Sequence, residues 1–295
     1  MAAGAKVATR RLPGGEVALV RFVVGILVTV LLVSLRAAQI RPSRWGWLAA
    51  RGLFGGLAVV TYFASIQASP VGVATLLNQT QPVYTMLFSW MLLGERPRRA
   101  ALGALALTLL GVTVIVLAGG AAGPNRASLT WRGSRGELLG IISAVSSGVA
   151  VTSIRAARRD RGDGTASETA WSVFFSFSLV GALVTLPVVL PPFGHWVTPN
   201  RPEWALLAGV GLVSTAAQVI MSASLRHLTG VQSGIIAQLI VPLTVILGIS
   251  LLGETLSPGF LLGASLTVTG VLLAILQASS RMLVAALPSP PGRAL

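Results

Sequence analysis

Nine stretches of about 20 predominantly apolar residues follow one another along the chain, and they constrain its fold more than any other feature. A helix needs about 20 apolar residues to cross a hydrocarbon core roughly 30 Å thick, whereas barrel strands alternate in polarity and last about 10 residues. The stretches therefore predict an all-α integral membrane protein with nine full transmembrane helices. They cover residues 17–35, 45–67, 71–93, 100–118, 136–154, 169–190, 203–224, 231–252 and 258–277.

The composition excludes the common alternatives to a membrane protein. Of the 295 residues 54% are hydrophobic and only 10% are charged, whereas a water-facing globular surface requires about 25% charged residues. Disorder is excluded as well, because disordered chains combine low hydrophobicity with high charge. The net charge of +14 comes from arginines scattered between the apolar runs, so it does not indicate a nucleic-acid partner. The absence of cysteine excludes disulfides, thiolate metal sites and cysteine nucleophiles.

The distribution of basic residues predicts how the protein lies in the membrane, because loops rich in Lys and Arg stay cytoplasmic. If the segment after the first run is inside and the sides alternate, twice as many basic residues fall inside as outside. This count places Arg51 with the inner group. We therefore expect a multi-pass protein of the cytoplasmic (inner) membrane, with a cytoplasmic C-terminus and the N-terminus of this chain outside.

A duplicated pattern divides the chain into two halves. Each half contains a run with a proline near its middle (Pro82, Pro242) that ends in Leu-Leu-Gly-Glu at 92–95 and 251–254. An odd number of spans in each copy inverts the second copy relative to the first, and secondary transporters use this device to build two alternately open faces. The expected domains are a first repeat at 1–118, a linker at 119–135, a second repeat at 136–277 and a cytoplasmic tail at 278–295.

The two halves are uneven, because four runs precede the linker and five follow it. The second half opens with the run 136–154, and the segment 154–159 at its end is similar to residues 6–11 near the start of the chain. We therefore expect that this sequence starts inside its first helix and lacks roughly a dozen residues of a 5 + 5 arrangement. The alternative is a nine-span protein with an external N-terminus.

Several of these features together resemble one known family. Val20-Arg21-Phe22, the two mid-run prolines, and the Gly-Glu pairs at 94–95 and 253–254 resemble the drug/metabolite transporter superfamily in its EamA-type ten-helix branch. The resemblance covers residues 6–277, and it is carried by the order and duplication of motifs that are weak singly. It implies a secondary transporter that moves a small organic solute (an amino acid, a nucleoside-like metabolite or a drug) by alternating access. It also implies a cavity lined mainly by the first, third, fourth, sixth, eighth and ninth of ten helices.

The two prolines also indicate where a substrate could bind. Proline lacks an N–H, so Pro82 leaves the carbonyl of Asn78 unbonded and Pro242 leaves that of Gln238 unbonded. Polar backbone at membrane depth is tolerated only against protein or a water-filled cavity. We hypothesise that Asn78 and Gln238 are paired substrate contacts; the alternative is that each amide satisfies the kink or holds neighbouring helices together. The full set of cavity candidates is Tyr62, Asn78, Gln79, Gln81, Thr85, Gln218 and Gln238.

Three charged residues near or within the apolar runs have predicted roles. Glu95 and Glu254 stand at run ends before a proline, where a carboxylate can cap the next helix. Arg21 lies within the first run and is expected to extend toward the interface or to pair with Glu16; the alternative is a counter-ion for an anionic solute. Because no carboxylate lies deep in a run, the residues fit a facilitator, an exchanger or a transporter whose substrate carries the proton.

Two other classes of function were weighed against transport. A membrane enzyme needs a clustered base or nucleophile, and His195 and His227 stand apart from each other, so we predict no enzyme, no metal site and no cofactor. A non-transporting fragment or partner subunit stays open as the second alternative. The expected partners are a small-molecule substrate and the lipid bilayer, without nucleic acid, while a homodimer is left open.

Overall fold

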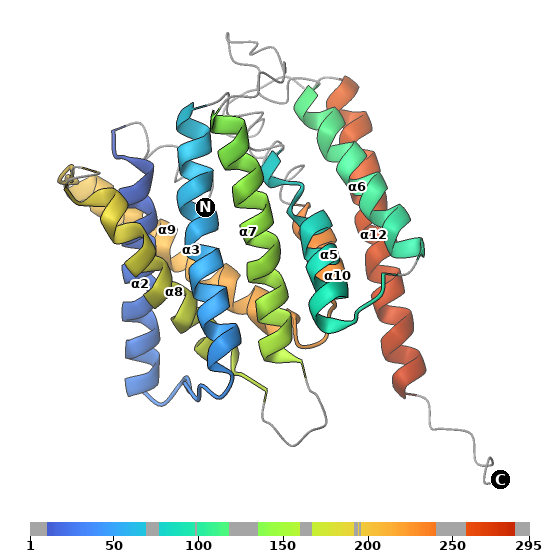
Figure 1. Ribbon diagram of the computed structural model, residues 1–295, viewed down its shortest axis with the longest axis horizontal. Helices are drawn as coiled ribbons and strands as arrows, with labels where there is room; N and C mark the ends of the chain where they lie inside the picture. The colour runs from blue at the N-terminus through green and yellow to red at the C-terminus, as the bar shows by residue number, and fades with distance from the viewer. Residues whose placement is uncertain are drawn as a thin grey trace.

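A computed structural model describes residues 11–68, 77–97, 99–117, 135–159, 167–191, 194, 196–239 and 258–286 of the chain. Every regular element within these residues is a helix, which confirms the predicted all-α class. The helices are α2 (Gly14–Ser34), α3 (Trp45–Ala68), α5 (Gln81–Leu93), α6 (Arg99–Leu117), α7 (Arg135–Arg158), α8 (Ala170–Val189), α9 (Arg201–Ser224), α10 (Gly230–Ala237) and α12 (Pro258–Ala286) (Figure 1).

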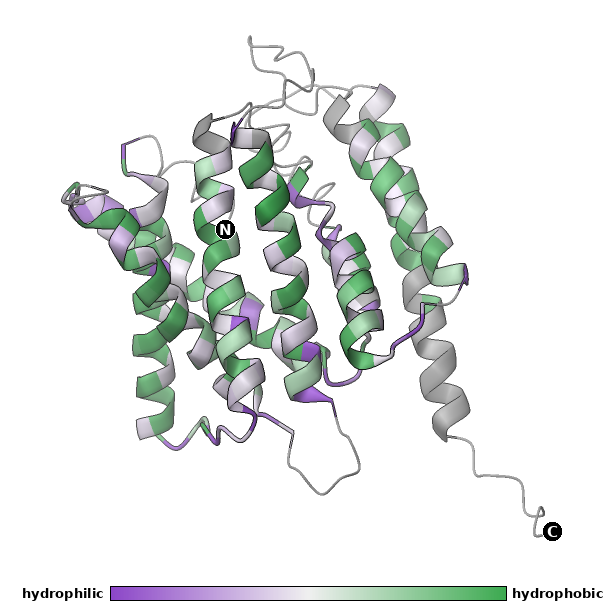
Figure 2. Ribbon diagram, in the orientation of Figure 1, coloured by the Kyte–Doolittle hydropathy of each residue, from purple (hydrophilic) through white to green (hydrophobic). Residues whose placement is uncertain are grey.

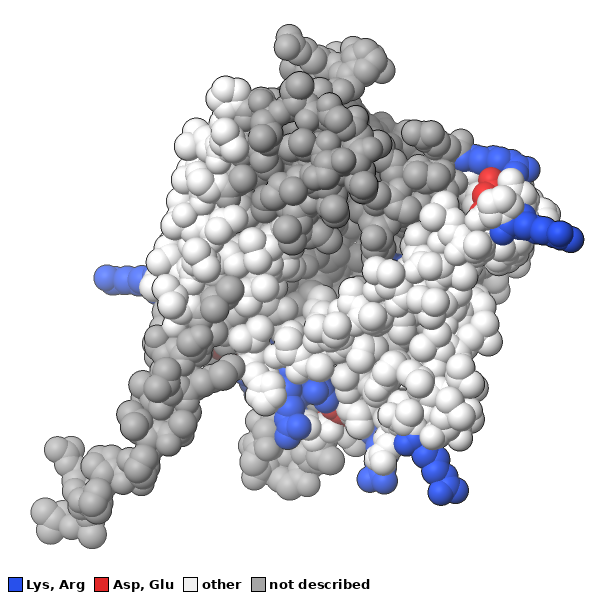
Figure 3. Space-filling model, turned by 180° about the vertical axis from the view of Figure 1, so that it is seen from behind, with Lys and Arg blue, Asp and Glu red and all other residues white. Residues whose placement is uncertain are grey.

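The helices have the length and surface of membrane-spanning elements. Five of them, α2, α3, α7, α8 and α9, are long and apolar enough to cross a bilayer, and α6 and α12 contain shorter apolar stretches. Hydrophobic residues run along most of α2, α3 and α7, with hydrophilic residues in the loops at their ends (Figure 2). Seen from behind, the charged side chains stand mostly near the upper and lower margins (Figure 3). This is the surface of a multi-pass membrane protein.

Within the described residues, two of the nine predicted runs contain a helix boundary. In the run 71–93, helical residues 77–78 are followed by a turn at 79–80, and α5 begins at Gln81. In the run 231–252, α10 ends at Ala237 and a turn follows at 238–239. The kink predicted at Pro82 is therefore a break between two helices, with the proline in the first turn of α5, where a missing N–H removes no helical hydrogen bond. Pro242 and Glu254 lie outside the described residues.

Corresponding helices of the two halves run in opposite directions, as inverted repeats require (Figure 1). The contact between α6 and α12 shows this at the level of single atoms. A Cβ added at Gly111 would lie 2.6 Å from the carbonyl oxygen of Gly263, and one added at Gly270 would lie 2.9 Å from that of Ala104. Gly111 and Gly270 hold equivalent positions in the two copies of the pattern, and so do Ala104 and Gly263. The two contacts are therefore related by the inversion.

This close approach gives a prediction about stability. Replacing Gly111 with alanine should lower the free energy of unfolding by about 1–3 kcal/mol, because the new methyl group would overlap backbone of α12. Gly103 is the matched control, since it lies on the same helix and a Cβ there would meet nothing within 4 Å. Thermal unfolding in detergent measures the difference. Equal unfolding midpoints for Gly111→Ala and Gly103→Ala would contradict the packing described.

The two ends of the bundle differ in charge. The loops 35–44, 94–97 and 225–229 lie at the lower end in Figure 1, together with the end of α7, and this end carries most of the arginines in the described residues. The count of basic residues predicts that these loops lie on the same side of the membrane, and the structure has them at the same end of the bundle. Arg51 is the exception, because it lies inside α3 with only 5% of its surface exposed and does not belong to a loop.

Candidate functional site

The break before α5 and the end of α10 meet in the interior of the protein. The Gln238 side chain donates a hydrogen bond from Nε2 to the main-chain carbonyl of Gln79 over 3.0 Å. These two glutamines are 159 residues apart, the same separation as the two Leu-Leu-Gly-Glu motifs. Equivalent positions of the two repeats are therefore in direct contact. Only 2% of Gln238 is exposed, and its Oε1 has no hydrogen-bond partner among the described residues.

The local sequence explains why the first break leaves polar groups open. Thr80 is the N-cap residue of α5, but its hydroxyl donates to the carbonyl of Leu77 over 2.6 Å and does not accept from the helix. The first turn of α5 therefore has no side-chain cap, although its Val83 N–H is bonded to the carbonyl of Thr80. The positive end of the helix dipole faces the break. With 13 residues, α5 is about 20 Å long, which places the break well inside a hydrocarbon core roughly 30 Å thick.

Small residues bring α10 and α7 close to α5 beside the break. Gly234 lies on Pro82, where an added Cβ would be 3.1 Å from the proline Cβ, and Gly230 lies on Thr85 and Ser89. The earlier residue of α10, Gly230, contacts the later part of α5, and Gly234 contacts its start, so the two helices are antiparallel. On the other side, Gly148 of α7 packs against the backbone of α5 at Thr85. The break is therefore enclosed by elements of both halves.

The structure places the two predicted substrate contacts in different hydrogen bonds. The Oδ1 of Asn78 accepts from the hydroxyl of Ser143 on α7 over 3.1 Å. Gln238 lies against the main chain of Gln79, directly after Asn78. Gln81 accepts from the buried Thr85 through its main-chain carbonyl. The residues that the structure gathers at the break are Asn78, Gln79, Gln81, Pro82, Thr85 and Gln238.

Two predicted cavity residues lie elsewhere in the fold. Tyr62 is half-buried on α3, with its ring 6.1 Å from that of Phe63. Gln218 of α9 accepts a hydrogen bond from Nη2 of Arg51 over 2.8 Å. Arg51 was not predicted as an interior residue, because the count of basic residues placed it with the inner segment after the first run. Its position six residues into an apolar run was the available signal, the same signal that singled out Arg21.

Arg21 does not take either of its two preferred predicted arrangements. Its guanidinium carbon lies 4.8 Å from the ring centroid of Phe22 and 5.8 Å from that of Phe177, so the side chain is turned toward the aromatic interior. The carboxylate of Glu16 instead accepts the backbone N–H of Val197 over 2.6 Å. Neither of the two ion pairs found among the described residues involves Arg21.

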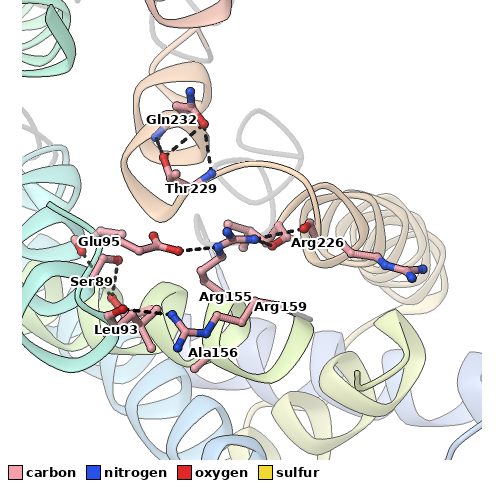
Figure 4. A network of polar contacts seen from close by, with 12 residues as sticks. Ser89, Leu93, Glu95, Arg155, Ala156, Arg159, Arg226, Thr229 and Gln232 are labelled. Carbon is pink, nitrogen blue, oxygen red and sulfur yellow. Dashed lines mark hydrogen bonds and ion pairs between the residues drawn. The ribbon is translucent and has the colours of Figure 1, made fainter. Parts of the chain in front are cut away.

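A set of polar contacts joins the two halves at the lower end (Figure 4). Nε of Arg155 donates to Oε1 of Glu95 over 2.9 Å, and Nη1 of Arg155 donates to the carbonyls of Leu225 and Arg226, each over 3.0 Å. Nη1 of Arg159 donates to the carbonyl of Leu93 over 3.0 Å. We call these contacts the Arg155 latch. They tie the end of α5 in the first half to α7 and α9 in the second.

The latch corrects the role predicted for Glu95. One of its carboxylate oxygens pairs with Arg155, and the other has no hydrogen-bond partner among the described residues. Glu95 therefore joins two halves of the protein and does not cap α6. Because the pair forms between segments 60 residues apart, the sequence carried no local signal for it.

A second set of contacts at the lower end centres on Glu168, which is fully buried. Its Oε1 accepts the backbone N–H groups of Ser43 and Arg44, each over 2.5 Å, and the hydroxyl of Ser43 over 3.0 Å. The backbone carbonyl of Glu168 accepts from Arg158. These bonds fix the start of α3 against the second half.

The described residues contain no group of three or more His, Cys, Asp or Glu side chains that could hold a metal ion. The chemistry that they do offer is hydrogen bonding by amides and main-chain groups at the break, and by guanidinium groups in the neighbouring interior. Such groups suit reversible binding of a polar solute.

Comparisons with known proteins agree with this geometry. Residues 1–117 and 134–276 each match the EamA-like transporter family. The pseudopaline exporter CntI of Pseudomonas aeruginosa (strain UCBPP-PA14) is 32% identical over 224 residues, covering 75% of this chain and 72% of the relative. An uncharacterized transporter of Archaeoglobus fulgidus is 31% identical over 237 residues, covering 79% and 77%. One solved crystal structure aligns over 95% of this chain and 93% of its own with a TM-score of 0.74; at 22% identity it shows a shared fold.

Proposed function

The chain belongs to the EamA-like transporter family and is a membrane transporter, and on this premise we propose that it is a secondary transporter of a small organic solute. It moves the solute across the cytoplasmic membrane by alternating access, with its C-terminus in the cytoplasm. The observation that carries the proposal is the contact between Gln238 and the main chain of Gln79, which brings the break before α5 and the end of α10, one from each half, to one point. Discontinuous helices that meet near mid-membrane are the usual substrate sites of such folds.

The arrangement of polar groups supports this mechanism. The buried Oε1 of Gln238 offers an unpaired acceptor beside the positive, uncapped start of α5, so a hydrogen-bond acceptor and a partial positive charge lie at the same place. The Arg155 latch holds the lower end closed, and its release would open the break to that side. The Pseudomonas relative is named as an exporter, which favours export as the direction of transport.

Loss of the Gln238 amide should impair transport. We expect Gln238→Ala to lower the rate of solute exchange about tenfold, because it removes the bond to Gln79 and a free acceptor worth roughly 1–2 kcal/mol to a bound solute. The measurement is counterflow in proteoliposomes with a panel of labelled amino acids, nucleosides and amphiphilic drugs. Gln39→Ala is the control, since the Gln39 side chain is exposed and its main-chain bond to Thr169 persists.

The outcomes separate the proposal from its alternatives. Wild-type rates in Gln238→Ala would remove the break from the transport pathway. Absence of flux for every solute in the panel, with correctly folded protein, would favour the non-transporting partner subunit.

A further inference from the structure

Two arginine side chains lie together in the interior of the helix bundle. The guanidinium carbons of Arg51 on α3 and Arg21 on α2 lie 3.8 Å and 5.8 Å from the centroid of the same ring, that of Phe177 on α8. Because both guanidinium groups lie beside one ring, their like charges repel. Arg21 is seven residues into α2 and Arg51 six into α3, so each stands roughly 10 Å of helix rise from its own end of the bundle. The pair therefore lies deep in the bundle.

The fold makes room for this pair. A Cβ at Gly55 would lie 2.7 Å from Nη1 of Arg51 and 2.8 Å from the Phe177 ring, so only glycine leaves space for the guanidinium to rest on the ring. The ring of Phe22 meets that of Phe177 edge to face, with centroids 5.0 Å apart. Gln218 takes up one N–H of Arg51. The guanidinium groups are thus held between aromatic rings and one amide.

Each of these arginines keeps an unused donor. Among the residues that the structure describes, Nε of Arg51 and Nη2 of Arg21 are buried without a hydrogen-bond partner, and neither arginine takes part in an ion pair. A buried cation without a counter-charge is costly in a membrane interior, and two neighbouring cations are costlier. Both costs fall if an anion binds between them. Planar guanidinium groups match a carboxylate, whose two oxygens can accept one N–H from each.

We infer that Arg21 and Arg51 bind the carboxylate group of the transported solute, and that the solutes of this transporter are organic carboxylates with an apolar body. The inference rests on the proposed transport function and names its substrate class. The carboxylate accepts from Arg51 Nε and Arg21 Nη2, and the apolar body lies against the aromatic cluster formed by Phe22, Phe174 and Phe177. A free inorganic anion offers the same charge without the apolar body, so the test includes it.

The first experiment measures binding without transport. Thermal unfolding of the purified full chain in detergent is followed with acetate, benzoate and N-acetyl-phenylalanine, each against its neutral amide, and with sodium sulfate at equal ionic strength. We expect benzoate or N-acetyl-phenylalanine to raise the unfolding temperature while their amides and sulfate do not. Arg21→Gln and Arg51→Gln should each raise the carboxylate concentration needed for half the effect by at least about tenfold. Arg201→Gln is the control, because Arg201 is exposed at the start of α9.

Several outcomes would overturn the inference. It fails if wild-type protein responds equally to the carboxylates and their amides, a comparison that needs no variant to fold. It fails if sulfate matches the organic acids, which would indicate a site for inorganic anions. Arg51→Lys refines the result: it keeps the charge but lacks Nε, so we expect it to recover only part of the binding.

The second experiment separates this inference from the proposed function. Counterflow in proteoliposomes is measured for N-acetyl-phenylalanine and its amide with wild type, Arg21→Gln and Arg51→Gln. Selective loss of carboxylate flux in the variants supports the inference. Transport restricted to neutral solutes and unchanged in the variants would overturn it while the transport function stands. Absence of all flux would remove the transport function, and the binding comparison would still decide whether the arginines hold a carboxylate.

Discussion

Replacing Arg155 with glutamine is expected to lower solute exchange roughly a hundredfold. The substitution removes the ion pair with Glu95 and the bonds to the carbonyls of Leu225 and Arg226. Hydrogen bonds to charged groups contribute about 1.5–3 kcal/mol each, so their joint loss shifts the balance strongly away from the state closed at the lower end. Alternating access requires that both closed states be populated, and exchange therefore falls. Counterflow in proteoliposomes measures the loss.

A labelling experiment tests whether the latch is the cause. The chain contains no cysteine, so a single Ser89→Cys substitution gives a reporter without background. Ser89 is fully buried beside Thr152, at the side of the latch. We expect an impermeant maleimide to label it faster in Arg155→Gln than in otherwise wild-type protein, from the side of the membrane that the lower end faces. Comparison of right-side-out and inside-out vesicles identifies that side and tests the predicted cytoplasmic orientation.

Arg226→Gln is the matched control for the latch. Its side chain is exposed, and only its backbone carbonyl takes part in the latch, so the contact with Arg155 survives the substitution (Figure 4). Normal exchange and normal labelling are expected. If Arg155→Gln behaved like Arg226→Gln in both assays, the latch would have no part in the transport cycle.

Replacing Glu168 with alanine is expected to lower the free energy of unfolding by about 3 kcal/mol or more. The buried carboxylate is the acceptor for the backbone amides of Ser43 and Arg44 and for the Ser43 hydroxyl. Its removal deprives these groups of an acceptor and leaves the neighbouring Arg158 without a nearby negative charge. Thermal or denaturant unfolding in detergent measures the change.

Glu203→Ala provides the comparison for Glu168. Glu203 also accepts backbone and side-chain bonds, in the capping box of α9 and with Arg11, but Arg11 is 56% exposed. Capping boxes and exposed ion pairs contribute about 1 kcal/mol. If Glu168→Ala and Glu203→Ala lowered the free energy of unfolding equally, the burial of Glu168 would add nothing to the stability of the protein.

At the candidate site, properties of single residues could be predicted from the sequence, whereas contacts between distant residues could not. Pro82 marks the break correctly because a missing N–H is a property of the residue itself. That Asn78 and Gln238 both contact the substrate stays a prediction, and the contact between Gln238 and the carbonyl of Gln79 had no local signal because it joins residues 159 positions apart. Glu95 was expected to cap the following helix, whereas the fold brings Arg155 within reach of its carboxylate.

The sequence by itself determined the class of this protein. Runs of about 20 apolar residues are typical of helices that span a bilayer, and the offset of five runs between the equivalent runs 71–93 and 231–252 requires inverted halves. These properties depend on composition and on order along the chain. Tertiary structure alone decided that Arg21 and Arg51 share the ring of Phe177, and that Gln238 meets Gln79. Such contacts join residues far apart in sequence, and they depend on how tightly glycine-lined helices approach one another, which no local pattern records.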